Sequence, residues 1–321
     1  MNPNRAMIFG PVPSRRLGRS LGINNIPPKI CSYSCLYCQV GRTTRMTIDR
    51  QEFFRPEEIL AAVQAKLEES AQAGEPVDYL SFVPDGEPTL DINLDRTIAL
   101  LRPLKIPIAV ITNTSLIWQK EVRHALSQAD WVSLKVDSVE ERIWRKIDRP
   151  HRHLKLAAML DGAAAFAGEF PGKLVTETML LAGINDTDPG LGRTARFLAT
   201  LRPATAYLSV PTRPPAEKWA RPANEQQVNR AFQLIQQGVA HAEYLTGYEG
   251  NAFAATGNLQ EDILNITAVH PMRQDAVAAF LEQAGAEWPV IDQLIREGEL
   301  AETEYAGHRF YLRKFSTETE R

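Results

Sequence analysis

Apolar residues along the chain gather in short runs that are separated by longer segments of mixed polarity. The short runs predict strands and lie at 77–83, 107–112, 131–136, 174–181 and 206–210. The longer segments carry apolar residues at helical spacing and predict helices at 55–69, 93–102, 119–129, 154–167, 191–201 and 225–237. Strand and helix alternate about six times, which predicts an α/β fold with a parallel sheet and crossover helices. A closed barrel of this kind has about eight such units.

The end of the chain has a different pattern. It predicts a helix at 271–284 and a second helix at 288–298 that a glycine stops. The remainder, with an Ala-Gly pair at its turn, predicts a β-hairpin. We therefore expect a large unit at 1–260 and a small unit at 266–321. Two helices followed by a hairpin resemble a winged-helix module, whose usual partner is DNA.

The charge of this small unit argues against DNA binding. Residues 266–321 contain six Lys or Arg and ten Asp or Glu, and six minus ten gives −4. A face that contacts phosphates needs several cations. We expect instead that the unit docks a peptide or protein or acts as a substrate lid.

Composition sets wide limits on the function. The chain has 321 residues, of which 44% are hydrophobic, and a net charge of −3. These values allow a sizeable core and give no general case for binding nucleic acid or membranes. Apolar runs stay well short of the roughly 18 residues that a transmembrane helix needs, and the N-terminal segment lacks the apolar stretch of a signal peptide. We expect a cytoplasmic protein without a membrane partner.

Basic residues are concentrated near the N-terminus. The segment 1–58 has nine Lys or Arg against four Asp or Glu, and nine minus four gives +5. These cations can pair with acids elsewhere or face water, or they can line the mouth of a site for an anionic substrate. The candidate mouth residues are Arg15, Arg16, Arg19, Arg213, Lys218 and Arg221.

All three cysteines of the chain, Cys31, Cys35 and Cys38, lie within eight residues. Thiolates are soft ligands for zinc, copper(I) or iron–sulfur clusters. A structural zinc site would need a fourth protein ligand, but the first histidine is His124. A disulfide would leave one thiol over. A [4Fe–4S] cluster fits the count best, with three irons bound by cysteine and one iron open, and a zinc site or three unrelated buried thiols are the alternatives.

The C-x3-C-x2-C spacing, with Tyr37 directly before the third cysteine, resembles the radical S-adenosylmethionine (SAM) superfamily. In that family the open iron binds SAM, and an electron from the cluster splits the sulfonium to give a 5′-deoxyadenosyl radical. The segment 10–24 resembles a subgroup related to wybutosine (tRNA wyosine) synthases. The resemblance implies a partial (β/α)6 barrel, a cofactor contact by Tyr37, and an electron donor such as a flavodoxin or ferredoxin.

Asp85, Gly86 and Glu87 follow the predicted strand at 77–83. Ligand sites in such sheets lie at the carboxyl ends of the strands. The tripeptide stands where the family has a Gly-Gly-Glu motif, so the resemblance implies that these residues bind the amino group of SAM. Asp85 departs from the motif because it replaces the first glycine. An ordinary turn after a strand is the alternative.

Three polar residues share one face of the predicted strand at 131–136 and its continuation. Side chains alternate along a strand, so Ser133, Lys135 and Asp137 point the same way. Charges inside a barrel are costly unless they are paired or bind a ligand. We expect all three to contact the ribose or carboxylate of SAM, or the substrate, and Lys135 and Asp137 are the candidate catalytic residues. A structural Lys–Asp pair is the alternative.

Other predicted strand ends also carry polar residues. Asn113 directly follows the strand at 107–112 and is a candidate SAM ligand, while Ser209 lies near the end of the last strand. Glu177 lies on the strand at 174–181 with Thr176 and Thr178 on the opposite face. One of these two faces must point into the barrel, and the pattern does not decide which.

These features predict a radical SAM enzyme that abstracts a hydrogen from an RNA base, a peptide, a protein or a small anionic metabolite. Wyosine synthases carry extra cysteines for a second cluster, and this chain has none left, which argues against the wyosine reaction. The alternative function is an iron–sulfur redox-sensing DNA-binding regulator. It would need a cationic recognition helix, whereas 288–298 contains only Arg296.

Overall fold

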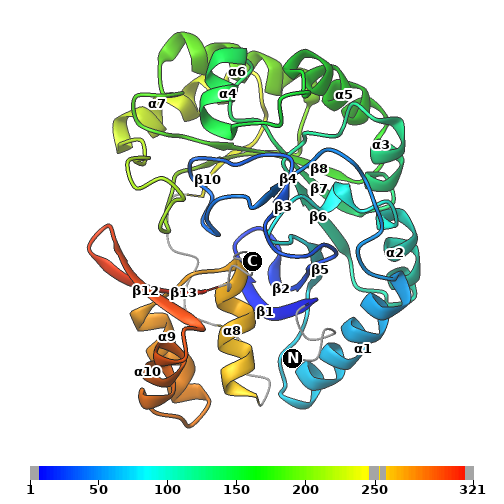
Figure 1. Cartoon of the computed structure of the whole chain (residues 1–321). Helices are drawn as coiled ribbons and strands as arrows, with labels where there is room; N and C mark the ends of the chain where they lie inside the picture. Colours follow the sequence, from blue (N-terminus) through cyan, green and yellow to red (C-terminus); the bar gives the residue numbers. More distant parts are fainter. Residues whose placement is uncertain (1–6, 246–252, 254–257, 315–321) are drawn as a thin grey trace.

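The computed structural model describes residues 7–245, 253 and 258–314, and its centre is a curled eight-stranded sheet (Figure 1). The strands, in their order across the sheet, are β1 (Ile8–Ser14), β2 (Gly18–Ile23), β5 (Tyr79–Phe82), β6 (Ile108–Thr112), β7 (Trp131–Lys135), β8 (Lys173–Met179), β9 (Thr205–Ser209) and β10 (Ala242–Leu245). The edge strand β1 is antiparallel to β2, and the other neighbours pair in parallel. The predicted partial barrel is confirmed.

Helices cover the outer face of this sheet (Figure 1). They are α1 (Pro56–Gln72), α2 (Leu94–Leu101), α3 (Lys120–Leu126), α4 (Glu141–Asp148), α5 (Leu156–Glu169), α6 (Asp188–Leu201) and α7 (Glu225–Gln236), with short 3-10 turns η2 (Pro88–Leu90) and η3 (Arg102–Leu104). The start of α1 follows from its sequence, because Pro56 suits a first turn and two glutamates follow it at the positive end of the helix. Within the described ranges, no helix is both long enough and apolar enough to cross a membrane.

The two faces of the sheet bury different side chains. Leu80, Val110 and Leu134 belong to the large core shared with the helices. The inner face has a separate apolar cluster, which lines the lumen and consists of Leu17, Ala109, Trp131, Val175, Tyr207 and Leu245. Glu177 follows Val175 by two residues along β8, so its side chain shares the lumen face. The structure therefore decides the orientation that the sequence pattern left open.

Besides the two N-terminal strands β1 and β2, helix α4 and strand β10 of the barrel were not predicted. Helix α4 has eight residues, of which five are charged, and only a narrow stripe with Trp144 and Ile147 is buried. Strand β10 has four residues at the edge of the sheet, where Glu243 and Tyr244 are exposed. Both segments are short and mostly polar, and tertiary packing rather than local pattern stabilises them.

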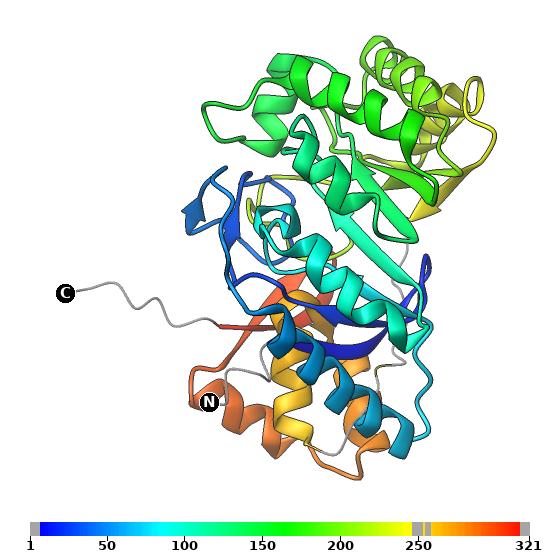
Figure 2. The same cartoon turned by 90° about the vertical axis from the view of Figure 1, so that its right-hand side faces the viewer.

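A small C-terminal unit packs beside the barrel (Figure 2). It contains α8 (Leu259–Val269), β11 (Met272–Arg273), α9 (Gln274–Gln283), α10 (Pro289–Arg296), β12 (Leu300–Tyr305) and β13 (His308–Arg313), and its sheet has the order β11-β13-β12. The two predicted helices and the hairpin are present. Helix α8 spans the boundary that we expected between 260 and 266, and most of the segment ahead of it lies outside the described residues. Its resemblance to a winged helix stays a prediction.

The core of the C-terminal unit includes two residues of the first strand. Phe9 and Val12 of β1 pack with Ile266, Phe280 and other apolar residues of the unit. The ring of Phe9 also lies against Gly22 of β2, where a Cβ atom would overlap with the ring. The first strand therefore joins the barrel and the C-terminal unit, and the ring of Phe9 contacts both.

The substitution Phe9→Ala tests this junction. We expect it to lower the free energy of unfolding by about 3–5 kcal/mol, because a buried phenylalanine side chain is lost and leaves a cavity. Urea unfolding followed by circular dichroism measures the change. Ile92→Ala is the control, since Ile92 is 46% exposed and its truncation should stay within about 0.5 kcal/mol. Equal effects of the two substitutions would contradict the role of Phe9.

Candidate functional site

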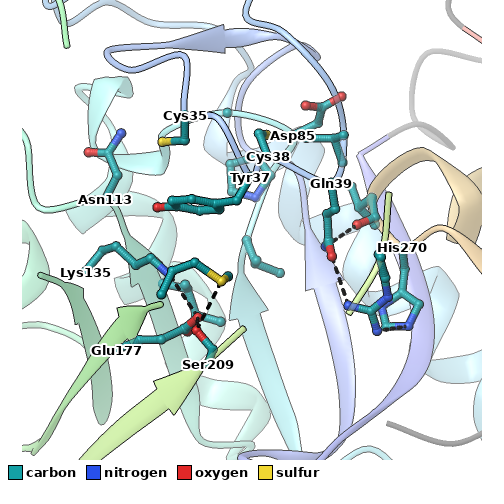
Figure 3. A pocket seen from close by; sticks show the side chains of 18 of the residues that line it. Cys35, Tyr37, Cys38, Gln39, Asp85, Asn113, Lys135, Glu177, Ser209 and His270 are labelled. Carbon is teal, nitrogen blue, oxygen red and sulfur yellow. Dashed lines mark hydrogen bonds and ion pairs between the residues drawn. The ribbon is translucent and has the colours of Figure 1, made fainter. Parts of the chain in front are cut away.

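A pocket of about 360 Å³ lies at the carboxyl ends of the strands, between the cysteine segment and the C-terminal unit (Figure 3). Its lining comes from β1, β2 and the turn between them, from the cysteine segment, from the ends of β5 to β10 and from the end of α8. Among the predicted site residues, those that line it are Cys31, Tyr37, Cys35, Cys38, Asp85, Gly86, Glu87, Asn113 and Lys135. The structure thus brings nine of the eleven predicted residues to one cavity.

The cysteine segment begins as a strand and continues as turns. Strand β3 (Ile30–Cys31) pairs in parallel with β4 (Arg45–Met46). The amide of Cys38 then donates to the carbonyl of Cys35 at 3.2 Å, and the amide of Gly41 donates to the carbonyl of Cys38 at 3.1 Å. These bonds fold the segment back on itself, so that three free thiols line the same pocket.

Burial keeps the three thiols protonated when no metal is bound. Burial and the carboxylate of Glu87 raise the pKa of Cys31 to about 12. Burial, together with Asp148, raises the pKa of Cys35 well above its usual value. Burial also raises the pKa of Cys38, although Lys29 opposes the effect. A metal cofactor must therefore displace protons from these sulfurs on binding.

The arrangement of the sulfurs suits a cofactor larger than one ion. Within the described residues, no three His, Cys, Asp or Glu side chains lie close enough to hold a single metal ion. A lone zinc would need its ligands at roughly 2.0–2.3 Å. Three free thiols that line one pocket instead suit an iron–sulfur cluster, whose separate irons each take one sulfur.

The turn at Asp85, Gly86 and Glu87 is bound directly to the strand that carries Cys31. Gly86 forms a parallel bridge with Ile30, and a Cβ atom at Gly86 would overlap with the Ile30 carbonyl. The amide of Glu87 donates to the carbonyl of Ile30 at 3.2 Å, and the amide of Lys29 donates to the carbonyl of Asp85 at 2.7 Å. Glycine is needed here because the two backbones approach so closely.

Protein groups already engage both carboxylate oxygens of Glu87. The hydroxyl of Thr112 donates to Oε1 at 2.6 Å, and the amide and hydroxyl of Thr89 donate to the same oxygen. The amide of Asn113 donates to Oε2 at 2.7 Å. Glu87 therefore holds the ends of β5 and β6 together, and its predicted contact with SAM stays a prediction.

Asn113 connects the end of β6 to the first cysteine. Its Nδ2 donates to the Sγ of Cys31 at 3.4 Å and to the Oγ of Ser32 at 2.9 Å. Its Oδ1 accepts from the amide of Ser115 at 2.9 Å, which fixes the orientation of the amide. Asn113 thus lines the pocket, and its side-chain amide donates to the cysteine segment. Its predicted contact with SAM stays a prediction.

Lys135 belongs to an ion network inside the lumen. Its Nζ lies 2.9 Å from Oε1 of Glu177 and 3.8 Å from Oδ1 of Asp137. Arg16 Nη1 reaches Oε2 of Glu177 at 2.5 Å, and Ser209 donates to Oε1 at 3.0 Å. The alternative of a structural Lys–Asp pair is thus only part of the arrangement, because the shorter contact of Lys135 is to Glu177.

The network keeps its charges despite being buried. Burial alone would raise the pKa of Glu177, but Lys135 and Arg16 hold it well below its usual value. Burial alone would lower the pKa of Lys135, but Asp137 and Glu177 raise it. Lys135 is therefore an ammonium ion, and Glu177 is a carboxylate.

Two carboxyl groups lie next to the hydroxyl of Tyr37. Its hydroxyl donates to Oδ2 of Asp137 at 2.5 Å and to Oδ1 of Asp148 at 3.3 Å. Burial and the charge of Asp137 raise the pKa of Asp148 well above its usual value, so the pair holds a proton. The Tyr37 ring lies between Cys35 and Lys135 in Figure 3, and its centre is 4.9 Å from the lysine Nζ.

Two predicted residues do not line the main pocket. Ser133 is buried on β7, two residues before Lys135. Asp137 lies beyond the end of β7, and its side chain borders a separate small cavity near Trp144. The alternation of faces correctly placed Lys135 but could not describe Asp137, since the regular strand ends at Lys135.

A chain of polar contacts closes one side of the pocket. Arg213 is 9% exposed, and it donates to Oε1 of Gln39 at 2.9 Å and to Nε2 of His270 at 2.6 Å. Gln39 in turn donates to the carbonyl of Val269 at 3.0 Å. Burial and Arg213 lower the pKa of His270 well below its usual value, so the imidazole is neutral and accepts. The C-terminal unit thereby contacts the residue that follows Cys38.

Sequence reasoning missed several residues of the site. Asp148 ends a helix that was not predicted, and Gln39 and His270 carry no local pattern that would mark them. Of the candidate mouth residues, Arg15, Arg16 and Arg213 line the pocket, and Arg16 also pairs with Glu177 in the lumen network. The other three do not line it: Arg19 pairs with Glu75, and Lys218 and Arg221 are exposed.

A protein family, a relative and two solved structures resemble this chain. The family model described as the Radical SAM superfamily matches residues 25–195. A UPF0026 protein of Methanocaldococcus jannaschii is 46% identical over 311 residues, which cover 96% of each chain. A radical SAM methyltransferase from Sphaerobacter thermophilus has a similar fold, with a TM-score of 0.53, 18% identity, and 71% of this chain and 66% of that chain covered. TYW1 with a lysine-pyruvate adduct bound has a TM-score of 0.54 at 14% identity, with 74% of this chain and 78% of that chain covered.

The substitution His270→Ala tests the closing contact. It removes a hydrogen-bond partner of a buried guanidinium, and we expect a loss of about 1.5–3 kcal/mol in the free energy of unfolding. The amides at 39–41 should also exchange with deuterium faster, because Gln39 loses its support. His308→Ala, in the exposed turn of the hairpin, is the control. Unchanged exchange at 39–41 would show that His270 does not hold the cysteine segment.

The carboxyl of Asp85 predicts a pH dependence. Burial raises its pKa from 3.8 to about 6, with Lys29 opposing the effect. Between about pH 4 and 6 the folded protein keeps a proton that the unfolded chain has released, so stability falls as the pH rises through this window. The loss is at most about 3 kcal/mol at 1.36 kcal/mol per pKa unit.

Urea unfolding of the metal-free protein from pH 4 to 7 measures this effect. The variant Asp85→Asn should not lose this stability as the pH rises. The difference in free energy of unfolding between wild type and variant should therefore change by up to about 3 kcal/mol between about pH 4 and 6. Parallel stability curves for the two proteins would contradict the raised pKa.

Proposed function

Because the chain belongs to the radical SAM superfamily, a superfamily of enzymes, we propose that Cys31, Cys35 and Cys38 hold a [4Fe–4S] cluster that binds SAM. When bound, the cluster and SAM would supply reductive, one-electron cleavage of the C5′–S bond of SAM and, through it, the removal of a hydrogen atom from a substrate. The observation that carries this proposal is that the three thiols, the turn at Asp85 and Lys135 line one pocket at the strand ends. The chemistry of the donor set, three soft sulfurs around a shared space, supports it.

The charged residues of the pocket match the charges of SAM. The turn at Asp85 offers a carboxyl group and backbone carbonyls, which suit an ammonium group. Lys135 is an ammonium ion whose Nζ lies beside the Tyr37 ring, and it suits a carboxylate or a ribose hydroxyl. These are the roles that we propose for Asp85 and Lys135, and we propose that Tyr37 packs against the cofactor.

Lys135 acts through its charge in this proposal. The structural neighbour TYW1 is described with a lysine-pyruvate adduct, and an adduct of that kind needs a neutral amine as nucleophile. Glu177 and Asp137 raise the pKa of Lys135 and so oppose that form. We therefore assign Lys135 to binding and orientation rather than to covalent chemistry.

We propose that the substrate carries an anionic group. Arg15, Arg16 and Arg213 all line the pocket, and guanidinium groups favour carboxylates and phosphates. An RNA base with its phosphate, a peptide carboxylate and a small anionic metabolite all satisfy this requirement. The three cysteines are all used by one cluster, which argues against the wyosine reaction with its second cluster.

Two further expectations belong to this proposal. Free thiols and an oxygen-sensitive cluster suit the reducing cytoplasm, which is the location that we propose.

The DNA-binding regulator gains no support from the described C-terminal unit, because α10 presents Arg296 as its one cation.

Anaerobic incubation with dithionite and SAM tests the proposal. The iron-reconstituted wild type should release 5′-deoxyadenosine, and the variant with Cys31, Cys35 and Cys38 changed to alanine should release none. Lys135→Met should bind the same amount of iron but lower the rate about tenfold or more, since it removes one charged contact to SAM.

Lys173→Met is the matched control for Lys135, because Lys173 is exposed at the opposite end of the sheet. A fully loaded wild type that releases no 5′-deoxyadenosine would refute the enzyme class. A Lys135→Met variant with the wild-type rate would refute only the role of Lys135.

A further inference from the structure

Three segments carry an unusual concentration of positive charge on the outer side of the cysteine segment. The segments are 39–50, 149–155 and 211–222. Together they contain nine Lys or Arg and two Asp or Glu, and nine minus two gives +7. The whole chain has a net charge of −3. Positive charge is therefore concentrated in this region, against the overall charge of the protein.

Ion pairs and hydrogen bonds hold the three segments together. Glu217 reaches Arg42 at 2.9 Å and Arg149 at 2.6 Å, so one carboxylate joins all three segments. The amide of Glu217 donates to the carbonyl of Leu36 at 3.0 Å, and the amide of His151 donates to the carbonyl of Ser32 at 2.9 Å. The segments thus form one continuous surface around the cysteines.

We call this surface the basic rim and define it by six residues that are exposed or half-buried. They are Arg42, Arg45, Arg149, Arg152, Lys218 and Arg221. None of the six is among the described residues that line the pocket. A substrate inside the pocket would therefore leave the basic rim uncovered.

The basic rim also exposes apolar side chains and lies close to Cys35. Trp219 is 51% exposed and Met46 is 39% exposed. Aromatic and methionine side chains are enriched in protein interfaces. Beneath this surface, Leu36, the residue after Cys35, packs with Ala220 and Ile147. A macromolecule on the basic rim would thus lie over the backbone that carries Cys35.

We propose that the basic rim docks an acidic one-electron donor protein, an inference that rests on the proposed function. Each cleavage of SAM consumes one electron, so the donor is oxidised by one electron while the C5′–S bond is broken. Redox proteins use small, transient interfaces in which complementary charge sets the encounter rate and the orientation. The place of the basic rim over the backbone that carries Cys35 favours a redox protein over a nucleic acid, whose binding is one outcome of the test.

Charge reversal on the basic rim tests the assignment with a matched control. The rim variant carries Arg152→Glu, Lys218→Glu and Arg221→Glu, all at exposed positions. The control variant makes the same change of charge at the amino ends of the strands, with Lys105→Glu, Lys173→Glu and Arg202→Glu. The probe is an acidic flavodoxin, used oxidised for binding and reduced for turnover.

Binding is measured by calorimetry at low and high salt and does not require turnover. We expect wild type and control to bind flavodoxin with a salt-dependent Kd. The Kd of the rim variant should be about tenfold higher or more. With reduced flavodoxin, release of 5′-deoxyadenosine by the rim variant should fall by a similar factor. With dithionite, the rim variant should match wild type, because a small reductant needs no docking surface.

Three results would overturn the assignment. The first is a wild type that does not bind flavodoxin. The second is a rim variant that binds flavodoxin as wild type does, or that is impaired equally with dithionite. The third is a single-stranded oligoribonucleotide that binds wild type but not the rim variant while flavodoxin binds neither. Failure of the proposed function is distinct, because it appears as a wild type that is inactive with dithionite.

Discussion

The backbone contact between Ile30 and Gly86 is the constraint on which the site depends. It attaches the strand before Cys31 to the end of β5 and requires a residue without a side chain at position 86. Glu87 then extends the connection to β6, and Asn113 returns from β6 to the sulfur of Cys31. The cysteine segment is thus held by the ends of two neighbouring strands rather than by its own turns alone.

Inside the barrel, charges of opposite sign pair with one another, so a network of charged side chains can be buried there. Glu177 accepts from Arg16, Lys135 and Ser209, so each buried charge has a partner of opposite sign or a hydroxyl group. The acidic pair of Asp137 and Asp148 beside Tyr37 holds a proton instead, because burial and the charge of Asp137 raise the pKa of Asp148. The pocket and the small cavity beside it therefore combine fixed ions with an acidic pair that holds a proton.

Much of this arrangement follows from sequence, and the limits have physical causes. Cysteine spacing located Cys31, strand alternation located Lys135, and the end of a predicted strand together with the family resemblance located the turn at Gly86, because each of these signals lies within a short stretch of sequence. The partners of those residues come from far away, as with Arg16 on Glu177 and His270 on Arg213. Such pairs depend on the way the elements pack, and no local pattern encodes them.

The place of Phe9 has a consequence for synthesis in the cell. The first strand leaves the ribosome long before α8 and the helices that complete the core around its side chain. Until then β1 remains an edge strand with an uncovered apolar face, which is the kind of surface that chaperones recognise and that promotes aggregation.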